Sequence, residues 1–493
     1  MPRSKVFRVL STAMPALTLA ASSAIAQAPA AGDHYRVAAP VPPGFDRAAA
    51  QRATETHLRR LIRLDTQNPP GNELLTARYF DSVFKTMPGV ETHVLPAAEG
   101  RANFIARLRA TSPTKRPVLV MGHMDVVGAD TSKWETPPFE PTVRDGYLYG
   151  RGAIDDKGML AATVAAMTQL ASRRDRLQRD IIFLATAAEE GGAAIGVDQV
   201  IERHRDLIGD VEFALNEGGR IRVGEERIRT VNIQTTEKVY YTVVGRAVGP
   251  SGHGSVPLPD NALAALARAI ARVHEWRPPA RLNETTRLYF ARLAGIEPDA
   301  AMRAAMQAIS RPGADAAAIA RAADVLSREP LHNAVLRTGA SLTLVSGGIR
   351  SNVIPSEGTA TFNVRVLPGE DIGEVVREIN RVGGEQAVTF TLDGQPLEAP
   401  PVSPVATDLF RAMEEAATAM APGVVVVPFM STGATDGAAL RAQGIPTYGI
   451  LPFPLIMEDE LRMHGDNERV PVPALGWAAE YLYRVLQTTA NAN

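Results

Sequence analysis

Two kinds of hydrophobic pattern alternate along the first half of the chain. Residues 117–121 (Pro-Val-Leu-Val-Met) and 181–185 (Ile-Ile-Phe-Leu-Ala) are short, nearly continuous apolar runs, which are typical of strands buried on both faces. Residues 48–64 and 159–172 instead carry apolar side chains at helical spacing. Since helices and buried strands take turns, the pattern predicts an α/β domain with a mostly parallel sheet.

The pattern changes near residue 236, where polar and apolar residues begin to alternate one by one. Such alternation is typical of antiparallel strands with one solvated face, and it predicts strands at 239–244, 341–345 and 358–366. Helical spacing at 262–273 adds an amphipathic helix. The Ala- and Arg-rich stretch 299–327 also has helical spacing, and we interpret it as a structural insertion.

After residue 405 the first pattern returns, with a helix to Ala419, a strand at 424–427 and a closing helix after Pro473. We therefore expect one larger α/β domain in two parts, 44–235 and 398–493. A smaller α+β domain, 236–397, is inserted between them.

Composition narrows the function. A chain of 493 residues with 45% hydrophobic content is long enough for two domains, and its net charge of −2 without a long basic run argues against a nucleic-acid partner. The chain has no cysteine, so any metal must be held by histidine and carboxylate side chains. We expect a small-molecule or peptide substrate.

The first residues resemble an export signal. Three basic residues precede an apolar run that extends to Ala20, and a small-residue triplet ends at Ala26. We expect a signal peptide at 1–26, a linker at 27–43, and a periplasmic or secreted product. The alternative is an uncleaved membrane anchor, although the apolar run is short and interrupted; no later segment looks membrane-spanning.

Chemistry-bearing residues follow several of the predicted strands. The strand at 117–121 leads into His123 and Asp125, which point to the same side because side chains alternate along a strand. The carboxyl ends of strands are where open α/β sheets bind ligands, and a carboxylate commonly orients a metal-binding histidine. The alternative for this pair is a surface loop with a hydrogen-bonded histidine.

A glycine-rich turn leads into Asp155 and Asp156 at the start of a helix. Its spacing matches neither a dinucleotide-binding loop nor a P-loop, so a phosphate site is a poor interpretation. One of the two aspartates, most simply Asp156, could cap the helix.

Two neighbouring carboxylates, Glu189 and Glu190, follow the strand at 181–185. A metal would explain them, with one Glu as ligand and the other as base, whereas a solvated acidic turn is the alternative. Glu217 follows another strand, and His464 lies near the C-terminus. Each motif is weak alone, but together they offer the ligand types that zinc accepts.

In this order the motifs resemble the dizinc aminoacylase and carboxypeptidase family of metallopeptidases. The resemblance spans nearly the whole chain after the signal. The segment Trp134–Phe139 before Asp145-Gly146 is most similar to the carboxypeptidase S and secreted N-acyl-amino-acid hydrolase branch. The family resemblance implies a parallel-sheet catalytic domain with an inserted dimerisation (lid) domain, and a homodimer.

The resemblance also implies residue roles. Asp155 would bridge two zinc ions, for which cobalt or manganese could substitute, and Glu189 would be the general base. The two sites would be completed by four further ligands: His123 and Glu217 in one, and Glu190 and His464 in the other. Some relatives have Asp at the position of Glu217.

Five further positions resemble substrate-binding or partner-reaching residues of the family. His253 in a glycine loop would reach the other subunit's catalytic centre, and Arg365 would hold a substrate carboxylate through paired hydrogen bonds. Asn352 and the loop that contains Gly433 and Thr435 would lie near that carboxylate.

The implied activity is hydrolysis of the amide bond next to a C-terminal amino acid with a free carboxylate. Three alternatives stay open: an N-acyl-amino-acid deacylase, an aminopeptidase that shares the metals but recognises a free amine, and a non-catalytic exported binding protein.

Overall fold

The computed structural model describes residues 33–491. The predicted signal peptide therefore lies outside the described residues. Within the described part, no helix combines the length and the apolar character needed to cross a membrane.

A ten-stranded mixed sheet forms the centre of the larger domain. Its strands, in sheet order, are β2 (Val90–Ala98), β3 (Arg101–Leu108), β8 (Ile181–Thr186), β4 (Val118–His123), β9 (Phe213–Asn216), β19 (Thr447–Gly449), β11 (Arg227–Glu237), β10 (Arg220–Gly224) and β20 (Pro454–Leu455), with β18 (Val425–Ser431) also paired to β11. The central strands β8, β4, β9 and β19 run parallel, whereas β2 and β3 add an antiparallel edge. The predicted α/β class with a mostly parallel sheet is confirmed.

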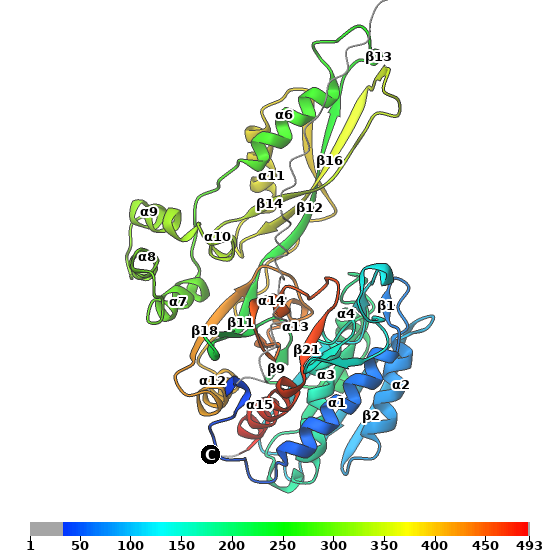
Figure 1. The fold of residues 1–493 in the computed structure, drawn as a ribbon, viewed down its shortest axis with the longest axis vertical. Coiled ribbons are helices and arrows are strands. Elements are labelled where there is room, and N and C mark those ends of the chain that lie inside the picture. Colours follow the sequence, from blue (N-terminus) through cyan, green and yellow to red (C-terminus); the bar gives the residue numbers. More distant parts are fainter. Residues whose placement is uncertain (1–32, 492–493) are drawn as a thin grey trace, which may run out of the picture. The chain divides into compact units, whose positions relative to one another are not determined.

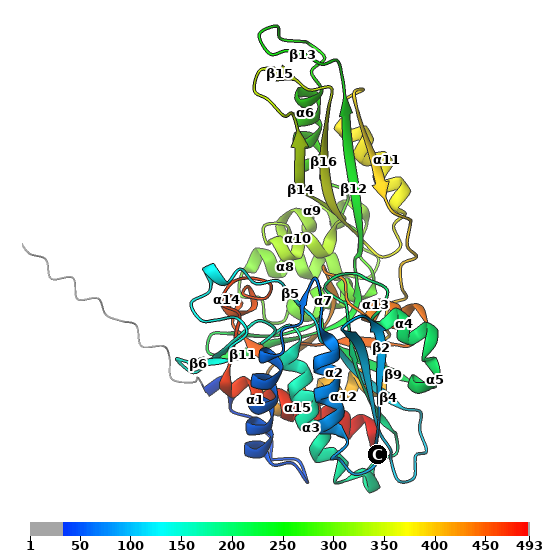
Figure 2. The same cartoon turned by 90° about the vertical axis from the view of Figure 1, so that its right-hand side faces the viewer.

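Helices cover both faces of this sheet. On one face lie α1 (Arg47–Arg63), α2 (Glu73–Phe84), α3 (Lys157–Ala171), α12 (Asp408–Met420) and α15 (Val472–Ala490), and on the other α4 (Val197–Arg203), α5 (Arg205–Ile208) and α13 (Gly437–Ala442) (Figure 2). Val120 packs into the first core and its neighbour Leu119 into the second. This two-sided burial explains why the strands read as continuous apolar runs.

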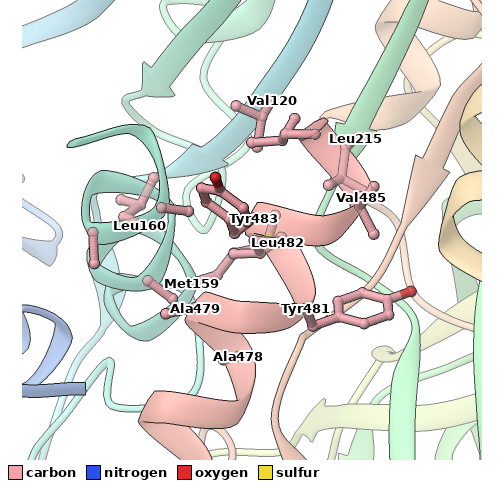
Figure 3. Close-up of a cluster of buried hydrophobic side chains, with 14 of the residues drawn as sticks. Val120, Met159, Leu160, Leu215, Ala478, Ala479, Tyr481, Leu482, Tyr483 and Val485 are labelled. Atoms are coloured by element: carbon pink, nitrogen blue, oxygen red, sulfur yellow. The ribbon is translucent and has the colours of Figure 1, made fainter. Parts of the chain in front are cut away.

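The closing helix α15 is buried along nearly its whole length, because it packs against both α1 and α3. Figure 3 shows Leu482 and Tyr483 of this helix among Met159 and Leu160 of α3 and Val120 of β4. Helix α15 thus helps to fix α3, the helix that follows Asp155.

The inserted domain has a separate core. Its sheet, in the order β14 (Gly339–Gly347), β16 (Glu357–Val366), β12 (Val239–Val248) and β17 (Val388–Asp393), is antiparallel throughout. The helices α6 (Ala262–His274) and α11 (Ile372–Gly383) share one apolar cluster with it (Figure 1). The predicted antiparallel sheet with helices on one face is present.

Four helices occupy the stretch between α6 and β14. They are α7 (Glu284–Leu293), α8 (Ala300–Ser310), α9 (Ala316–Leu326) and α10 (Pro330–Leu336). The stretch 299–327 is thus two helices, each started by an aspartate that caps it, Asp299 and Asp315. Their apolar faces join Val427 and Phe429 of β18 in one cluster, so this insertion packs against the larger domain.

Short elements complete the chain. They are β1 (Gln67–Asn68), β5 (Val126–Val127), β6 (Thr142–Arg144), β7 (Tyr147–Tyr149), β13 (Gly252–His253), β15 (Val353–Ile354), α14 (Met457–Glu460), β21 (Arg469–Pro471) and three 3-10 turns, Asp33–Tyr35, Thr131–Lys133 and Arg174–Arg176.

Candidate active site

His123 is the last residue of β4, and its ring is oriented at both nitrogens. Nδ1 lies 2.9 Å from the backbone oxygen of Asp125, so this nitrogen carries the proton and donates it. Nε2 faces Asp155 Oδ1, 2.9 Å away. Asp125 contributes its carbonyl to this arrangement, with its carboxylate 3.6 Å from Nδ1.

The carboxylate of Asp125 organises the neighbouring acidic loop. It accepts hydrogen bonds from the backbone N–H groups of Glu189 and Glu190, both at 3.2 Å, and from the Asn68 side chain at 2.7 Å. The turn at Ala188 has a positive φ of 65°, which bends the chain directly after β8. Asp125 thus holds the two glutamates beside the end of β4.

Asp155 faces both histidines. Its Oδ2 lies 3.1 Å from Nε2 of His464, which in turn lies 3.0 Å from Oε1 of Glu190. Burial opposes ionisation of Asp155, but hydrogen bonding with the two histidines outweighs it and holds the pKa of this carboxyl far below its usual range. One carboxylate oxygen per histidine is the arrangement expected of a bridging ligand.

Glu217 directly follows β9, next to the other acidic side chains. Burial, together with the charge of Asp155, raises the pKa of Glu217 to about 8. Burial raises the pKa of Glu189 well above its usual range as well. So many carboxyl groups cannot all be ionised in one buried place unless cations balance them.

The donor set fits two divalent cations. Ligand atoms of His123, Glu189 and Glu190 lie within 4.8 Å of one another, and so do those of Asp155, Glu190 and His464. Nε2 of His123 and Nε2 of His464 each face one oxygen of Asp155, so this carboxylate is shared between the two histidines. Imidazole and carboxylate ligands suit zinc.

Asp156 does not cap α3, contrary to the sequence-based interpretation. It occupies the N-cap position, but its side chain makes no capping hydrogen bond, and both carboxyl oxygens are buried without a hydrogen-bond partner. Burial raises its pKa well above the usual range. The side chain instead packs against Gly122, where any Cβ would come within 1.9 Å of Asp156 Oδ2.

A cavity of about 670 Å³ opens over these residues. His123, Asp155, Glu189, Glu190, Glu217 and His464 all line it. The rest of its wall includes apolar and cationic side chains, among them Leu331, Phe429, Met463, Arg220, Arg222 and Arg365, together with Tyr240, Glu460 and hydroxyl side chains. The structure therefore brings all five predicted ligands and the predicted base into one accessible space.

Arg365 lies in the same cavity with unused hydrogen-bonding capacity. Its guanidinium stacks on the Tyr240 ring at 4.7 Å and donates from Nε to Asn363 at 2.9 Å. Its Nη1 is buried without a hydrogen-bond partner. An anion in the cavity would satisfy this donor.

The loop after β18 brings Gly433 and Thr435 to the cavity. Thr435 is held by Glu237, which accepts from its backbone N–H at 3.1 Å and from its hydroxyl at 2.8 Å. Glu237 is buried and also pairs with Arg441 at 2.8 Å. The end of β11 therefore fixes the position of this loop.

His253 and Asn352 do not line the cavity. They lie together in the inserted domain, where β13 pairs with β15 and the backbone N–H of Gly254 donates to the carbonyl of Asn352 at 2.8 Å. Both residues are exposed. The cavity of a single chain thus contains the five predicted metal ligands and the predicted base. His253 and Asn352 of the same chain lie outside it.

Several residues of the site escaped the sequence analysis. Glu468 is buried and accepts from the backbone N–H groups around Asp155. Arg220 and Arg222 alternate along β10 into the cavity, where Glu460 pairs with Arg222 at 2.9 Å. In the sequence, the signal for Glu468 was its place at the end of the His-Gly-Asp-Asn-Glu motif. The signal for Arg220 and Arg222 was the Arg-x-Arg alternation after Glu217.

Comparison with known proteins links this geometry to a family. The sequence profile of peptidase family M20/M25/M40 matches residues 119–488. A probable carboxypeptidase S-like 2 of Dictyostelium discoideum is 29% identical over 430 residues, which cover 82% of this chain and 78% of the relative. The N-fatty-acyl-amino acid synthase/hydrolase PM20D1 of Homo sapiens is 25% identical over 470 residues, 93% of this chain and 92% of the relative.

Solved structures share the fold. The M20 family metallo-carboxypeptidase Sso-CP2 of Sulfolobus solfataricus aligns with a TM-score of 0.64 at 18% identity, over 89% of this chain and 99% of that one. Human carnosine dipeptidase 1 aligns with a TM-score of 0.61 at 15% identity, over 90% of this chain and all of the other.

Proposed function

This chain belongs to peptidase family M20/M25/M40, and we propose that it is an exported dizinc hydrolase that cleaves the amide bond beside a terminal amino acid with a free carboxylate. The resemblance seen in the sequence is thereby confirmed at the level of the family, as is the expectation of a metallopeptidase-type enzyme. A non-catalytic binding protein is disfavoured, because every ligand position and the base keep a competent side chain.

The observation that carries the proposal is the position of Arg365. Its unsatisfied guanidinium N–H lines the same cavity as the metal ligands and Glu189. A substrate carboxylate bound by Arg365 would leave the adjacent amide within the cavity, directed toward the ligand cluster. Guanidinium binds carboxylate through two parallel hydrogen bonds, so it would orient the substrate as well as bind it.

Two zinc ions held by the five ligands would polarise the scissile carbonyl and make a water acidic enough to react at neutral pH. Within this chain, Glu189 is the group placed to accept a proton from that water and to pass it to the leaving amine. Asp125 keeps Glu189 in position through its backbone N–H. The Tyr240 ring lies beneath the Arg365 guanidinium, whose central carbon is 4.7 Å from the ring centroid.

The acyl half of the substrate has a different environment. Leu331, Phe429 and Met463 supply an apolar wall. Apart from the proposed ligands and Glu189, the cavity wall contains one carboxylate, Glu460. This carboxylate already accepts two hydrogen bonds from Arg222. A free amino group would thus find no unpaired carboxylate there, which disfavours an aminopeptidase.

A second candidate function is hydrolysis of N-acyl amino acids with an apolar acyl group. The apolar wall favours it, and so do the relatives named N-fatty-acyl-amino acid synthase/hydrolase. It differs from the carboxypeptidase proposal only in the acyl half. Rates on N-acyl amino acids and on peptides with free C-termini, measured side by side, separate the two.

We also propose that the working form is a homodimer in which His253 and Asn352 of one subunit complete the cavity of the other. The edge strand β14 supports this, because among the described residues it pairs only with β16 and exposes Leu344 and Val345 (66% and 61%). An open apolar edge is a site for pairing with another chain.

The proposal is tested by metal removal and restoration. Protein stripped with a chelator should lose hydrolysis of an N-acyl amino acid, and zinc should restore it, with cobalt or manganese as substitutes. Full activity in the stripped protein would overturn the metal assignment. Export is tested by locating the mature N-terminus after expression of the whole chain, with cleavage expected after Ala26.

A further inference from the structure

A second cavity, of about 620 Å³, adjoins the active-site cavity. Arg365 and Thr432 line both cavities, so the two meet at the proposed carboxylate-binding arginine. The second cavity lies between the segment after α6, the helix α10 and the start of β14. The residues of its wall used below are Lys238, Trp276, Arg277, Arg337 and Arg365.

This cavity is strongly cationic. One lysine and three arginines line it, and none of its lining residues is Asp or Glu. Within residues 33–491, no carboxylate pairs with Lys238, Arg277 or Arg365, and Arg337 reaches only the exposed Asp324, at 3.7 Å. Cations lining one space without counter-charges repel one another, so an anion placed among them would be stabilised.

Two of these cations also keep buried donors unused. Nε of Arg337 and Nη1 of Arg365 are buried and have no hydrogen-bond partner. A buried donor left unsatisfied costs free energy, and natural proteins keep few of them. Since the Arg365 donor is assigned to the α-carboxylate, the unused donor of Arg337 is the one that points to a further ligand with acceptor oxygens.

Lys238 adds a buried positive charge at the junction between β11 and β12. It is 3% exposed and donates to the backbone oxygen of Arg337 at 2.5 Å. Burial lowers its pKa to about 8, although the charge of Glu370 acts in the opposite direction. Glu370 itself does not enter the cavity wall, and Arg281 pairs with it at 2.7 Å.

We propose that this cavity is a second anion subsite, which accepts a negatively charged side chain on the carboxylate-bearing half of the substrate. The preferred leaving group is then an acidic amino acid, aspartate or glutamate. The inference rests on the proposed function, because it assigns the α-carboxylate to Arg365 and the side-chain carboxylate to the adjoining cavity. The second anion is thereby placed beyond Arg365, in a wall that contains none of the metal ligands.

Kinetics with matched substrates test the proposal. Zinc-loaded wild-type protein should cleave an N-acyl-glutamate with a kcat/KM about 10-fold or more above that for the isosteric N-acyl-glutamine, since a charge-assisted hydrogen bond contributes roughly this factor. Arg277→Glu should reduce the ratio to about 2 or less, mostly through KM. Arg277 is exposed and hydrogen-bonds only within its own turn, so its replacement should not unfold the protein.

Arg321→Glu is the matched control. Arg321 is exposed on α9, outside both cavities, so this variant makes the same charge change and should keep the wild-type ratio. An equal rate for the two substrates in wild-type protein would overturn the proposal, and so would an unchanged ratio in Arg277→Glu. Hydrolysis of neither substrate would count against the proposed function instead.

A binding measurement works without turnover. Of the three tryptophans, Trp134 and Trp477 are buried, whereas Trp276 lines the cationic cavity. Glutarate should change the tryptophan fluorescence at concentrations about 10-fold lower than its monoamide glutaramate does, and Trp276→Phe should remove the signal. Equal half-saturation by the dicarboxylate and the monoamide would contradict a second anion subsite even in a protein that hydrolyses nothing.

Discussion

The carboxylate of Glu468 accepts a hydrogen bond from the backbone N–H of Asp155 at 3.2 Å, across 313 residues of sequence. The same carboxylate accepts from the backbone of Gly152 and Ile154 and pairs with the buried Arg151 at 2.9 Å. The C-terminal motif therefore supplies the proposed ligand His464 and also fixes the loop that presents Asp155, the proposed bridging residue. Residues from the two sequence segments of the catalytic domain are thus connected through the side chain of Glu468.

Glu468→Gln should weaken both stability and metal binding. Leaving Arg151 buried without its partner costs about 3–5 kcal/mol, and a misplaced Asp155 should lower metal affinity about 10–100-fold. Thermal unfolding with and without zinc measures both effects. Glu458→Gln, an exposed change nearby, is the control. Unchanged zinc affinity in Glu468→Gln would show that Glu468 does not position the bridge.

Glu189→Gln should keep the metals but lose activity. The amide cannot accept a proton, and general-base catalysis contributes about 10²–10⁴-fold. Metal content by elemental analysis, together with kcat on an N-acyl amino acid, checks the two halves separately. Near-normal turnover by the metal-loaded variant would rule out Glu189 as the base.

His57 should make the fold sensitive to acid. Its ring is partly buried and interacts with the hydroxyl of Tyr79 at 2.7 Å, and burial lowers its pKa from 6.5 to about 4. The unfolded state therefore binds more protons between these values, so stability is full above pH 6.5 and falls toward pH 4, by up to about 3 kcal/mol.

His57→Gln should flatten the stability profile in this window relative to wild type. Unfolding by denaturant at pH 4.5 and pH 7 measures the difference, and the exposed His93→Gln provides the control. The same loss of stability in wild type and His57→Gln would exclude His57 as its source.

The proposed sharing of sites between subunits predicts complementation. His253→Ala and Glu189→Gln should each be nearly inactive alone, because each damages every site of its own dimer. Co-expressed, they should form mixed dimers with one intact site, which restores about a quarter of wild-type activity if assembly is random. Activity of the mixture no higher than that of the separate variants would contradict a shared site.

The sequence predicted the fold, and it pointed to the acidic and histidine residues that line one cavity, because both depend on local patterns. Buried parallel strands read as apolar runs, and His123, Glu190 and Glu217 each come directly at or after such a strand. The register of those strands brings the residues together. The order of the motifs along the chain was enough to predict that they would meet.

Other features depend on contacts that no local pattern encodes. Asp156 stands where a capping residue belongs, but the close approach of Gly122 encloses its carboxyl group and leaves it without a partner. The stretch 299–327 carried the correct helical spacing, yet its packing on β18 depends on residues more than a hundred positions later. Arg337 and Arg365 likewise meet only through tertiary structure.

The most direct measurement compares a free carboxylate with a carboxamide. The zinc-loaded enzyme should cleave an N-acyl amino acid about 10–100-fold faster, in kcat/KM, than the same compound with its α-carboxylate amidated, because charged hydrogen bonds to Arg365 are lost. Arg365→Gln should lower kcat/KM for the free acid by a similar factor. It should change kcat/KM for the carboxamide only a little. Equal cleavage of acid and carboxamide by the wild-type protein would contradict the account.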